Sequence, residues 1–146
     1  MMNTAVYEAN NVFAKILRGD IPSVRVHEDG LCVAFMDVMP QGPGHALVVP
    51  RAASRNLLDA DPQTLVHILP VVQKIARAAM IAFAADGISV LQFNETAGGQ
   101  SVFHLHFHVI PRFTGVPLRP HTGHMEAHDV LTAHGEKLRE ALAKGA

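Results

Sequence analysis

The stretch AGGQSVFHLHFHVIPR, from Ala97 to Arg112, places three histidines at every second position of an otherwise apolar run. Side chains alternate across a β-strand, so His104, His106 and His108 are predicted to share one face. The opposite face would turn toward the core with Phe103, Leu105, Phe107 and Val109. Because three neighbouring imidazoles all need hydrogen-bond partners, the pattern indicates a functional surface more than ordinary core packing.

Five short strands are predicted from apolar runs that turn residues interrupt. Their sequences are VRVHED (24–29), LCVAFMDV (31–38), HALVV (45–49), GISVLQFN (87–94) and VFHLHFHVI (102–110). Asp29-Gly30 between the first two is a hairpin signal. Short turns link most of these strands, so the sheet is expected to be antiparallel.

Three helices complete the pattern. Val12 to Arg18 is predicted to be a short helix that Gly19 ends. Asp61-Pro62 starts a long helix, because aspartate caps well and proline fits the first turn. Pro70 lies inside this helix, so a kink or two abutting helices are expected. Helical spacing predicts a buried face made of Leu65, Leu69, Val72, Ala76, Ala79 and Phe83. A last helix is predicted from Glu126 to Lys144.

These elements predict an α+β fold: an antiparallel sheet of about five strands, one long helix and short terminal helices. The length of 146 residues suits one domain, residues 1–146, because two sizeable cores would need a longer chain. Nearly half the residues are hydrophobic and charges are sparse, which is typical of a compact body and not of a disordered chain.

Composition excludes several classes of function. The formal net charge of -1 gives no reason to expect a nucleic-acid or membrane partner. Cys32 is the only cysteine, so neither an intramolecular disulfide nor a cluster of thiolate ligands can form. The start MMNTAVYEANNVF lacks the pattern of a signal peptide, and the longest apolar run, Ala78 to Ala85, is far short of the roughly 20 residues of a membrane span. A cytoplasmic location is expected.

Two kinds of chemistry fit the three histidines. Histidines can bind a catalytic zinc ion, but His104 and His108 would lie roughly 13 Å apart along a strand. At most two of the three could then share one ion, with His45 as a further ligand. The other possibility is an imidazole nucleophile that attacks phosphorus. The adjoining Gly98-Gly99-Gln100-Ser101 can aim backbone N–H groups, an amide and a hydroxyl at anionic oxygens.

The motif HLHFHVIPR resembles the signature of the histidine-triad (HIT) superfamily. The segments FAKILRGDIPSVRVHED, AFMDVMPQGPGHALVVP and NETAGGQSVFHLHFHVIPR are similar, in order, to the three blocks of that superfamily. They cover most of the chain from Phe13 to Arg112. The block FAKILRGDIP is closer to the Hint-type and general bacterial branches than to the Fhit-type hydrolases, which carry asparagine at the position of Asp37.

The resemblance implies a HIT-like fold and a covalent mechanism without a metal or another cofactor. By analogy His106 attacks the α-phosphorus of a nucleotide, and water then cleaves the nucleotidyl-histidine. His104 would hold His106 through its backbone carbonyl, and His45 would support the triad from a neighbouring strand. His108 would contact the phosphate and stabilise charge in the transition state, in a reaction that depends on positioning and electrostatics.

The resemblance also implies a nucleotide pocket and a homodimer. The carboxylate of Asp37 is expected to accept hydrogen bonds from both ribose hydroxyls. Residues expected to line the base and ribose pocket are Val12, Phe13, Ile16, Phe35, Asp37, Val38 and Leu47. Residues expected around the phosphate are Asn94, Gln100, Ser101 and the backbone of Val102. The family dimerises through the long helix and an adjoining strand, which joins two sheets into one.

This chain departs from its relatives at several positions. Some bacterial members bind a structural zinc ion through two cysteines and a histidine, and here those positions carry Asn11, Ala14 and Ala53. No zinc site of that type is therefore expected. Glu95 stands where relatives often have a small residue, which could place negative charge near the phosphates. Residues 113–146 match no block of the family and are expected to be a variable C-terminal segment.

The function expected from the resemblance is hydrolysis of purine nucleoside phosphoramidates of the AMP–amine type. Dinucleoside polyphosphate hydrolysis, with a nucleotide as the leaving group, is the alternative enzymatic activity. A nucleotide-responsive interaction protein with incidental turnover and a metal-dependent hydrolase are the other possibilities.

Overall fold

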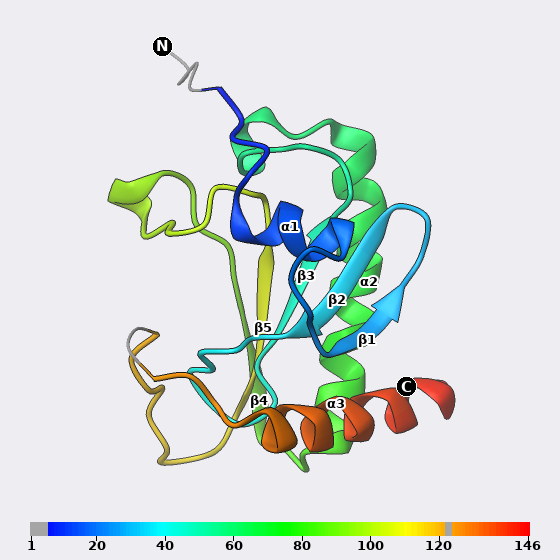
Figure 1. The fold of residues 1–146 in the computed structure, drawn as a ribbon. Coiled ribbons are helices and arrows are strands. Elements are labelled where there is room, and N and C mark those ends of the chain that lie inside the picture. Colours follow the sequence, from blue (N-terminus) through cyan, green and yellow to red (C-terminus); the bar gives the residue numbers. More distant parts are fainter. Residues whose placement is uncertain (1–5, 122–123) are drawn as a thin grey trace.

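The computed structural model describes residues 6–121 and 124–146, and Figure 1 shows the fold. The helices are α1 (Val12–Arg18), α2 (Pro62–Ala82) and α3 (His128–Ala143), with short 3₁₀ helices at Leu57–Asp59 and Thr96–Gly98. The strands are β1 (Arg25–Glu28), β2 (Cys32–Met36), β3 (Ala46–Pro50), β4 (Gly87–Leu91) and β5 (Phe107–Arg112). All pairings between strands are antiparallel, in the order β1-β2-β3-β5-β4. The expected α+β class and the five-stranded sheet are confirmed.

Helices cover both faces of the sheet, with α1 on one side and α2 on the other (Figure 1). Alternation along β2 divides the core between the two faces: Ala34 and Met36 pack toward α2 and α3, while Val33 and Phe35 pack toward α1. Strand β3 repeats the pattern, because Val48 belongs to the first cluster and Leu47 to the second. The central strands are thus buried on both faces, which fixes their register.

Helix α2 is continuous through Pro70, so the expectation of two abutting helices is wrong. Asp61 accepts a hydrogen bond from the Gln63 amide and caps the helix as predicted. The predicted buried face is only partly correct, because Leu69 is 51% exposed. The residues that pack on the sheet are Ile68, Val71, Val72, Ile75, Ala78 and Ala79. By length and composition α2 is also apolar enough to cross a membrane, yet this row packs against the sheet as a core helix.

The strand that carries the histidines is shorter than predicted. It begins at Phe107, so only His108 belongs to β5, and His104 and His106 lie in the irregular segment before it. The alternation nevertheless continues, because Leu105, Phe107 and Val109 all join the cluster beneath α2. Phe103 does not: its ring lies 4.2 Å below the guanidinium of Arg55 and is partly exposed.

Candidate active site

His106 is buried and its ring is held by one hydrogen bond. Its Nδ1 lies 2.6 Å from the backbone carbonyl oxygen of His104. A carbonyl can only accept, so Nδ1 carries the proton and a neutral His106 has its lone pair on Nε2. The ring packs edge-on against Phe13 of α1, with centroids 4.7 Å apart. The backbone of the histidine segment therefore presents His106 with one nitrogen ready to act as a nucleophile or base.

His104 is anchored at both ring nitrogens. Its Nε2 lies 2.8 Å from the carbonyl oxygen of Pro50, which again places the proton on that nitrogen. Its Nδ1 then accepts from the hydroxyl of Tyr7, the only tyrosine of the chain, and the two rings meet edge-on. His104 is fully buried, so these contacts fix the carbonyl that holds His106.

His45, just before β3, and His108 of β5 form a second relay. The backbone amide of Gln41 donates to Nδ1 of His45 at 3.0 Å, so a neutral His45 carries its proton on Nε2. That nitrogen lies 2.9 Å from Nδ1 of His108 and donates to it. The proton of His108 then resides on Nε2. Pairing of Leu47 in β3 with His108 in β5 sets this distance.

The four histidines are predominantly neutral near pH 7. Burial disfavours a charged ring and lowers the pKa of His108 to about 3 and that of His45 to about 4. Burial also lowers the pKa of His104 and His106, and their hydrogen bonds to backbone carbonyls offset it only in part. The lone pair of His106 consequently stays available below the pH at which an ordinary histidine protonates.

Asp37 lies at the end of β2 beside this cluster and is 5% exposed. Its Oδ1 accepts from the Met39 amide at 2.8 Å, and its Oδ2 lies 3.0 Å from Nε2 of His121 and 3.4 Å from Nε2 of His45. Burial alone raises the pKa of Asp37, but the hydrogen bond from His121 and the Met39 amide outweigh it, so the pKa falls below its ordinary value. The same hydrogen bond raises the pKa of His121.

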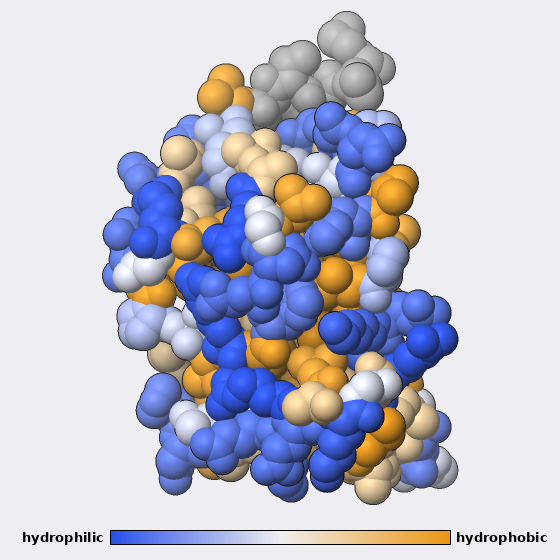
Figure 2. All heavy atoms as spheres, turned by 90° about the vertical axis from the view of Figure 1, so that its right-hand side faces the viewer, coloured by the Kyte–Doolittle hydropathy of each residue, from blue (hydrophilic) through white to orange (hydrophobic). Residues whose placement is uncertain are grey.

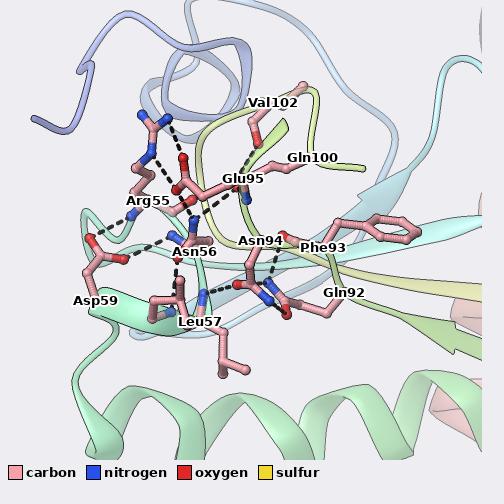
Figure 3. Close-up of polar contacts among 11 residues, drawn as sticks. Arg55, Asn56, Leu57, Asp59, Gln92, Phe93, Asn94, Glu95, Gln100 and Val102 are labelled. Atoms are coloured by element: carbon pink, nitrogen blue, oxygen red, sulfur yellow. Dashed lines mark hydrogen bonds and ion pairs between the residues drawn. The ribbon is translucent and has the colours of Figure 1, made fainter. Parts of the chain in front are cut away.

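Figure 3 shows the polar network that shapes the loop before the histidines. The amide oxygen of Gln100 accepts from the Glu95 amide and from the side chain of Asn56. Its Nε2 donates to the carbonyls of Arg55 and Val102, at 2.8 and 3.0 Å. A glutamine amide has only two N–H bonds, so neither is left for a phosphate. The expected contact from the Gln100 side chain is therefore replaced by an internal brace.

Glu95 does not present an isolated negative charge. Arg55 binds its carboxylate through two parallel bonds of 2.9 and 3.0 Å, and Asn56 donates a third at 2.6 Å (Figure 3). Glu95 adopts a φ of +65°, and Gly99 a φ of +102°, which turns the loop sharply. The guanidinium compensates the charge that the sequence suggested would lie near a phosphate.

The other expected phosphate residues differ in their contacts and exposure. Asn94 accepts from the Leu57 amide and exchanges two bonds with Gln92, so most of its capacity is used within the loop. Ser101 is exposed, and Val102 packs against the apolar cluster beneath α1. Of the expected donors near the triad, the Ser101 hydroxyl is the one whose side chain faces solvent.

A cavity of about 340 Å³ opens between α1, the end of β2 and the C-terminal segment. It brings together the residues that the sequence assigned to a nucleoside: Val12, Phe13, Ile16, Phe35, Asp37, Val38 and Leu47. Residues of the variable segment close its other side: Met125, Glu126, His128 and Leu131. The lining is mainly apolar with a few polar groups, as small-molecule pockets commonly are. Phe13 belongs both to this cavity and to the wall of His106.

Metal-ligand atoms do occur together at this site. Asp37, His45 and His108 each offer an atom, and these atoms lie within 4.8 Å of one another. The relay from the Gln41 amide, however, already places a proton between His45 and His108.

The zinc site of some relatives has no equivalent ligands here. Asn11 caps α1 by accepting from the amide of Ala14, and both Ala14 and Ala53 lack a donor atom. These residues do not fit a zinc ion of that type.

No sequence pattern pointed to several residues of this site. Tyr7 lies 97 positions from His104, and no motif contains it. His121 belongs to a C-terminal run of histidines whose roles the pattern did not distinguish. His124 and His128 in that run are four apart, but α3 begins only at His128, so the two do not share a helix. Met125 and Glu126 had no signal beyond their place in the variable segment.

Comparison with known proteins places this chain among those with a HIT domain. The family model for the HIT domain matches residues 18–115. The crystal structure of a HIT-like protein from Bartonella henselae, described as involved in cell-cycle regulation, is 53% identical, covers 93% of this chain and 99% of its own, and superposes with a TM-score of 0.88. An uncharacterized HIT-like protein of Mycobacterium tuberculosis is 38% identical over 134 residues, which are 91% of this chain and 93% of the relative. The adenosine 5'-monophosphoramidase of Schizosaccharomyces pombe is 38% identical over 101 residues, 69% of this chain and 73% of that enzyme.

Proposed function

Because this chain belongs to the HIT family, whose hydrolase relatives it resembles over most of its length, we propose that it hydrolyses purine nucleoside phosphoramidates through a nucleotidyl-histidine. The observation that carries the proposal is the bond from Nδ1 of His106 to the His104 carbonyl, since it leaves the Nε2 lone pair as the nucleophile. A monophosphoramidase among the relatives favours AMP joined to an amine as the substrate.

The reaction proceeds in two displacements. Nε2 of His106 forms a bond to the α-phosphorus, while the bond from phosphorus to the leaving nitrogen breaks and the amine departs with a proton from solvent. A water molecule then forms a bond to phosphorus and gives up a proton to solvent, while the bond from phosphorus to Nε2 breaks and the nucleoside monophosphate leaves His106. The first step makes the imidazole cationic, and its Nδ1–H bond to the His104 carbonyl strengthens as charge appears.

The relay from His45 supplies the other electrostatic contribution. Because His45 donates to Nδ1 of His108, the Nε2–H of His108 can donate to a phosphate oxygen. The Ser101 hydroxyl and backbone amides of the loop complete the phosphate site. Gln100 shapes that loop from within. A donor held in a buried site stabilises developing charge more than the same donor in water.

The nucleoside occupies the apolar cavity beneath α1 in this proposal. A purine ring packs between the side chains of Val12, Ile16 and Leu47. Asp37 stands at the cavity wall and accepts from the ribose hydroxyls. The Phe13 ring, shared by cavity and triad, then sets the distance between base and nucleophile.

We further propose that the chain forms a homodimer through α2 and β4. The outer stripe of α2 is apolar and exposed, with Val66 at 65% and Ile81 at 66% exposure, and Val90 of β4 is 47% exposed. Strand β4 is an edge of the sheet, so a second copy can pair with it. An Ile81→Asp variant should shift the protein toward monomer in analytical ultracentrifugation.

A cytoplasmic location stays a prediction.

The decisive experiment is hydrolysis of an AMP–amine phosphoramidate in EDTA by wild type, His106→Ala and the exposed control His124→Ala. Wild type and control should turn over, and His106→Ala should lose at least about a thousandfold in kcat while binding AMP within about tenfold. Turnover by His106→Ala at the wild-type rate would exclude the covalent mechanism. Hydrolysis of dinucleoside polyphosphates alone would assign a nucleotide leaving group, and absence of any turnover with normal AMP binding would favour an interaction protein.

A further inference from the structure

A second cluster of metal-ligating side chains lies on the opposite face of the sheet from His106. It joins the tip of the β1–β2 hairpin to the first half of α2, and the hairpin projects to the right in Figure 1. Figure 2 looks onto that side, where hydrophobic patches lie between hydrophilic side chains. The members of the cluster are His27, Asp29, Cys32 and His67.

All of these side chains converge on the carboxylate of Asp29. Nε2 of His27 lies 2.8 Å from Oδ2, and Nε2 of His67 lies 3.1 Å from each of the two oxygens. Sγ of Cys32 lies 3.4 Å from Oδ2. Three different elements, β1, β2 and α2, thus aim nitrogen or sulfur atoms at one point.

Five donor groups approach the carboxylate of Asp29. Its Oδ1 also accepts from the amides of Leu31 and Cys32, at 2.7 and 2.8 Å, which closes the hairpin turn. A carboxylate offers about four lone-pair sites, and the two amides occupy two of them. Two imidazoles and a thiol compete for what remains. A single cation in place of those protons would satisfy every member at once.

We propose that His27, Asp29, Cys32 and His67 bind one divalent transition-metal ion of the zinc class. The ligand atoms of His27, Asp29 and Cys32 lie within 4.8 Å of one another. Bonds of about 2.0–2.3 Å in a tetrahedral zinc site place ligand atoms roughly 3.3–3.8 Å apart, so small side-chain movements suffice. His67 supplies the fourth ligand. Imidazole, thiolate and carboxylate together favour zinc or cobalt over magnesium or calcium.

Access and charge are consistent with an ion at this point. His27, Asp29 and His67 line an open cavity beside α2. Binding releases the thiol proton of Cys32, so thiolate and carboxylate together balance a charge of +2. The nearest guanidinium, that of Arg51, donates to the backbone of Asp29 and is shared with Glu28 at 3.4 Å. Lys74 lines the same cavity and is the one further cation among its described lining residues.

The single cysteine makes the test specific. Tetrahedral Co²⁺ bound to a thiolate gives a sulfur-to-metal charge-transfer band in the near ultraviolet, and only Cys32 can supply that sulfur. Full-length protein is freed of metal with a chelator, titrated with Co²⁺ and then with Zn²⁺. The expected result is a saturable band at one equivalent, which Zn²⁺ abolishes.

Variants assign the remaining ligands. His27→Gln and His67→Gln should each weaken Zn²⁺ binding at least about tenfold, as loss of one ligand does, while the control His124→Gln changes it less than twofold. Cys32→Ser should abolish the band. His67 is 35% exposed on α2, so its variant keeps the fold even where a change at the buried Cys32 does not.

Two results would overturn the proposal: no thiolate band at millimolar Co²⁺, or a band that His27→Gln and His67→Gln leave unchanged. The outcome is independent of the proposed hydrolase activity, because the band reports only on Cys32. Cobalt that binds at Asp37 and His45 instead would give no sulfur band.

Discussion

Nε2 of His121 lies 3.0 Å from Oδ2 of Asp37, which joins the C-terminal segment to the end of β2 across 84 positions of sequence. Asp37 is buried and its pKa is lowered, while the pKa of His121 is raised by the same bond. The pair therefore favours an ionised Asp37 and a protonated His121. It brings the ring of His121 within 5.5 Å of His108 and 6.0 Å of His45, both neutral, measured between ring centroids.

Replacing Asp37 by asparagine should return the pKa of His121 toward its ordinary value. Because its pKa is raised in the folded state, protonated His121 stabilises the fold fully below about pH 6.5, the pKa of an unfolded histidine. This stabilisation is lost as pH rises through the pKa of folded His121. Proton NMR of the His121 ring as a function of pH measures the change. An unchanged titration of His121 in Asp37→Asn would show that another group raises its pKa.

Asp37→Ala should weaken binding of AMP more than binding of its 2′-deoxy counterpart. The carboxylate can accept from both ribose hydroxyls, and the deoxy sugar offers one fewer donor. Loss of a hydrogen bond to a charged group corresponds to about 1.5–3 kcal/mol, or roughly a tenfold to hundredfold change in Kd. Calorimetric titration of both nucleotides checks it, and equal losses would place the ribose elsewhere.

Activity should persist at mildly acidic pH. The pKa of His106 is lowered by burial, so kcat/KM should stay level below about pH 6.5, where an ordinary imidazole is half protonated. A pH–rate profile of the first turnover measures it. A decline centred near pH 6.5 would contradict the neutral nucleophile.

The free energy of unfolding should fall as pH falls below about 6.5. Unfolded histidines bind protons below about pH 6.5, whereas folded His45 and His108 do so only near pH 4 and 3. Their contribution is thus complete above about pH 6.5 and is lost as pH falls toward 3. Thermal melts from pH 7 to 4 should show that Tm falls as pH falls. In His108→Gln this decrease in Tm should be smaller.

Tyr7→Phe should lower kcat without weakening AMP binding. The substitution keeps the ring but removes the hydroxyl that donates to Nδ1 of His104. His104 then holds its carbonyl, and hence His106, less rigidly. Loss of one neutral hydrogen bond corresponds to about 1 kcal/mol, or roughly a fivefold decrease in kcat. Steady-state kinetics separate the effect, since a purely structural role would move Tm and Kd together with kcat.

Gly44→Ala should destabilise the fold by about 1–3 kcal/mol. Gly44 has a φ of +81°, and an added Cβ would lie 2.4 Å from the ring of Phe83. Gly87→Ala is the matched control, because nothing lies within 4 Å of its Cβ position. Urea denaturation of both variants measures the difference. Equal midpoints would show that the PGH turn adapts without strain.

The elements with strong local signals agree with their sequence predictions. Helix α1 spans Val12–Arg18, with Gly19 in the left-handed conformation at its end, and α2 begins after its Asp61 cap. These signals depend on contacts a few residues apart, which the chain carries whatever its tertiary fold. The buried face of α2 was harder, because both of its sides are apolar and only packing distinguishes them. For that reason helical spacing predicts a buried Leu69, whereas its side chain lies at the surface.

The sequence by itself determined the histidine face, the apolar residues that line the cavity beneath α1 and the family, because alternation and motif spacing are local properties. Only the tertiary structure decided which nitrogen of each histidine carries a proton. Those tautomers depend on Pro50, Gln41 and Tyr7, which approach from distant parts of the chain. It also decided that Gln100 braces its loop. Hydrogen-bond capacity is fixed by residue type, but its use is set by whichever partners the fold brings within reach.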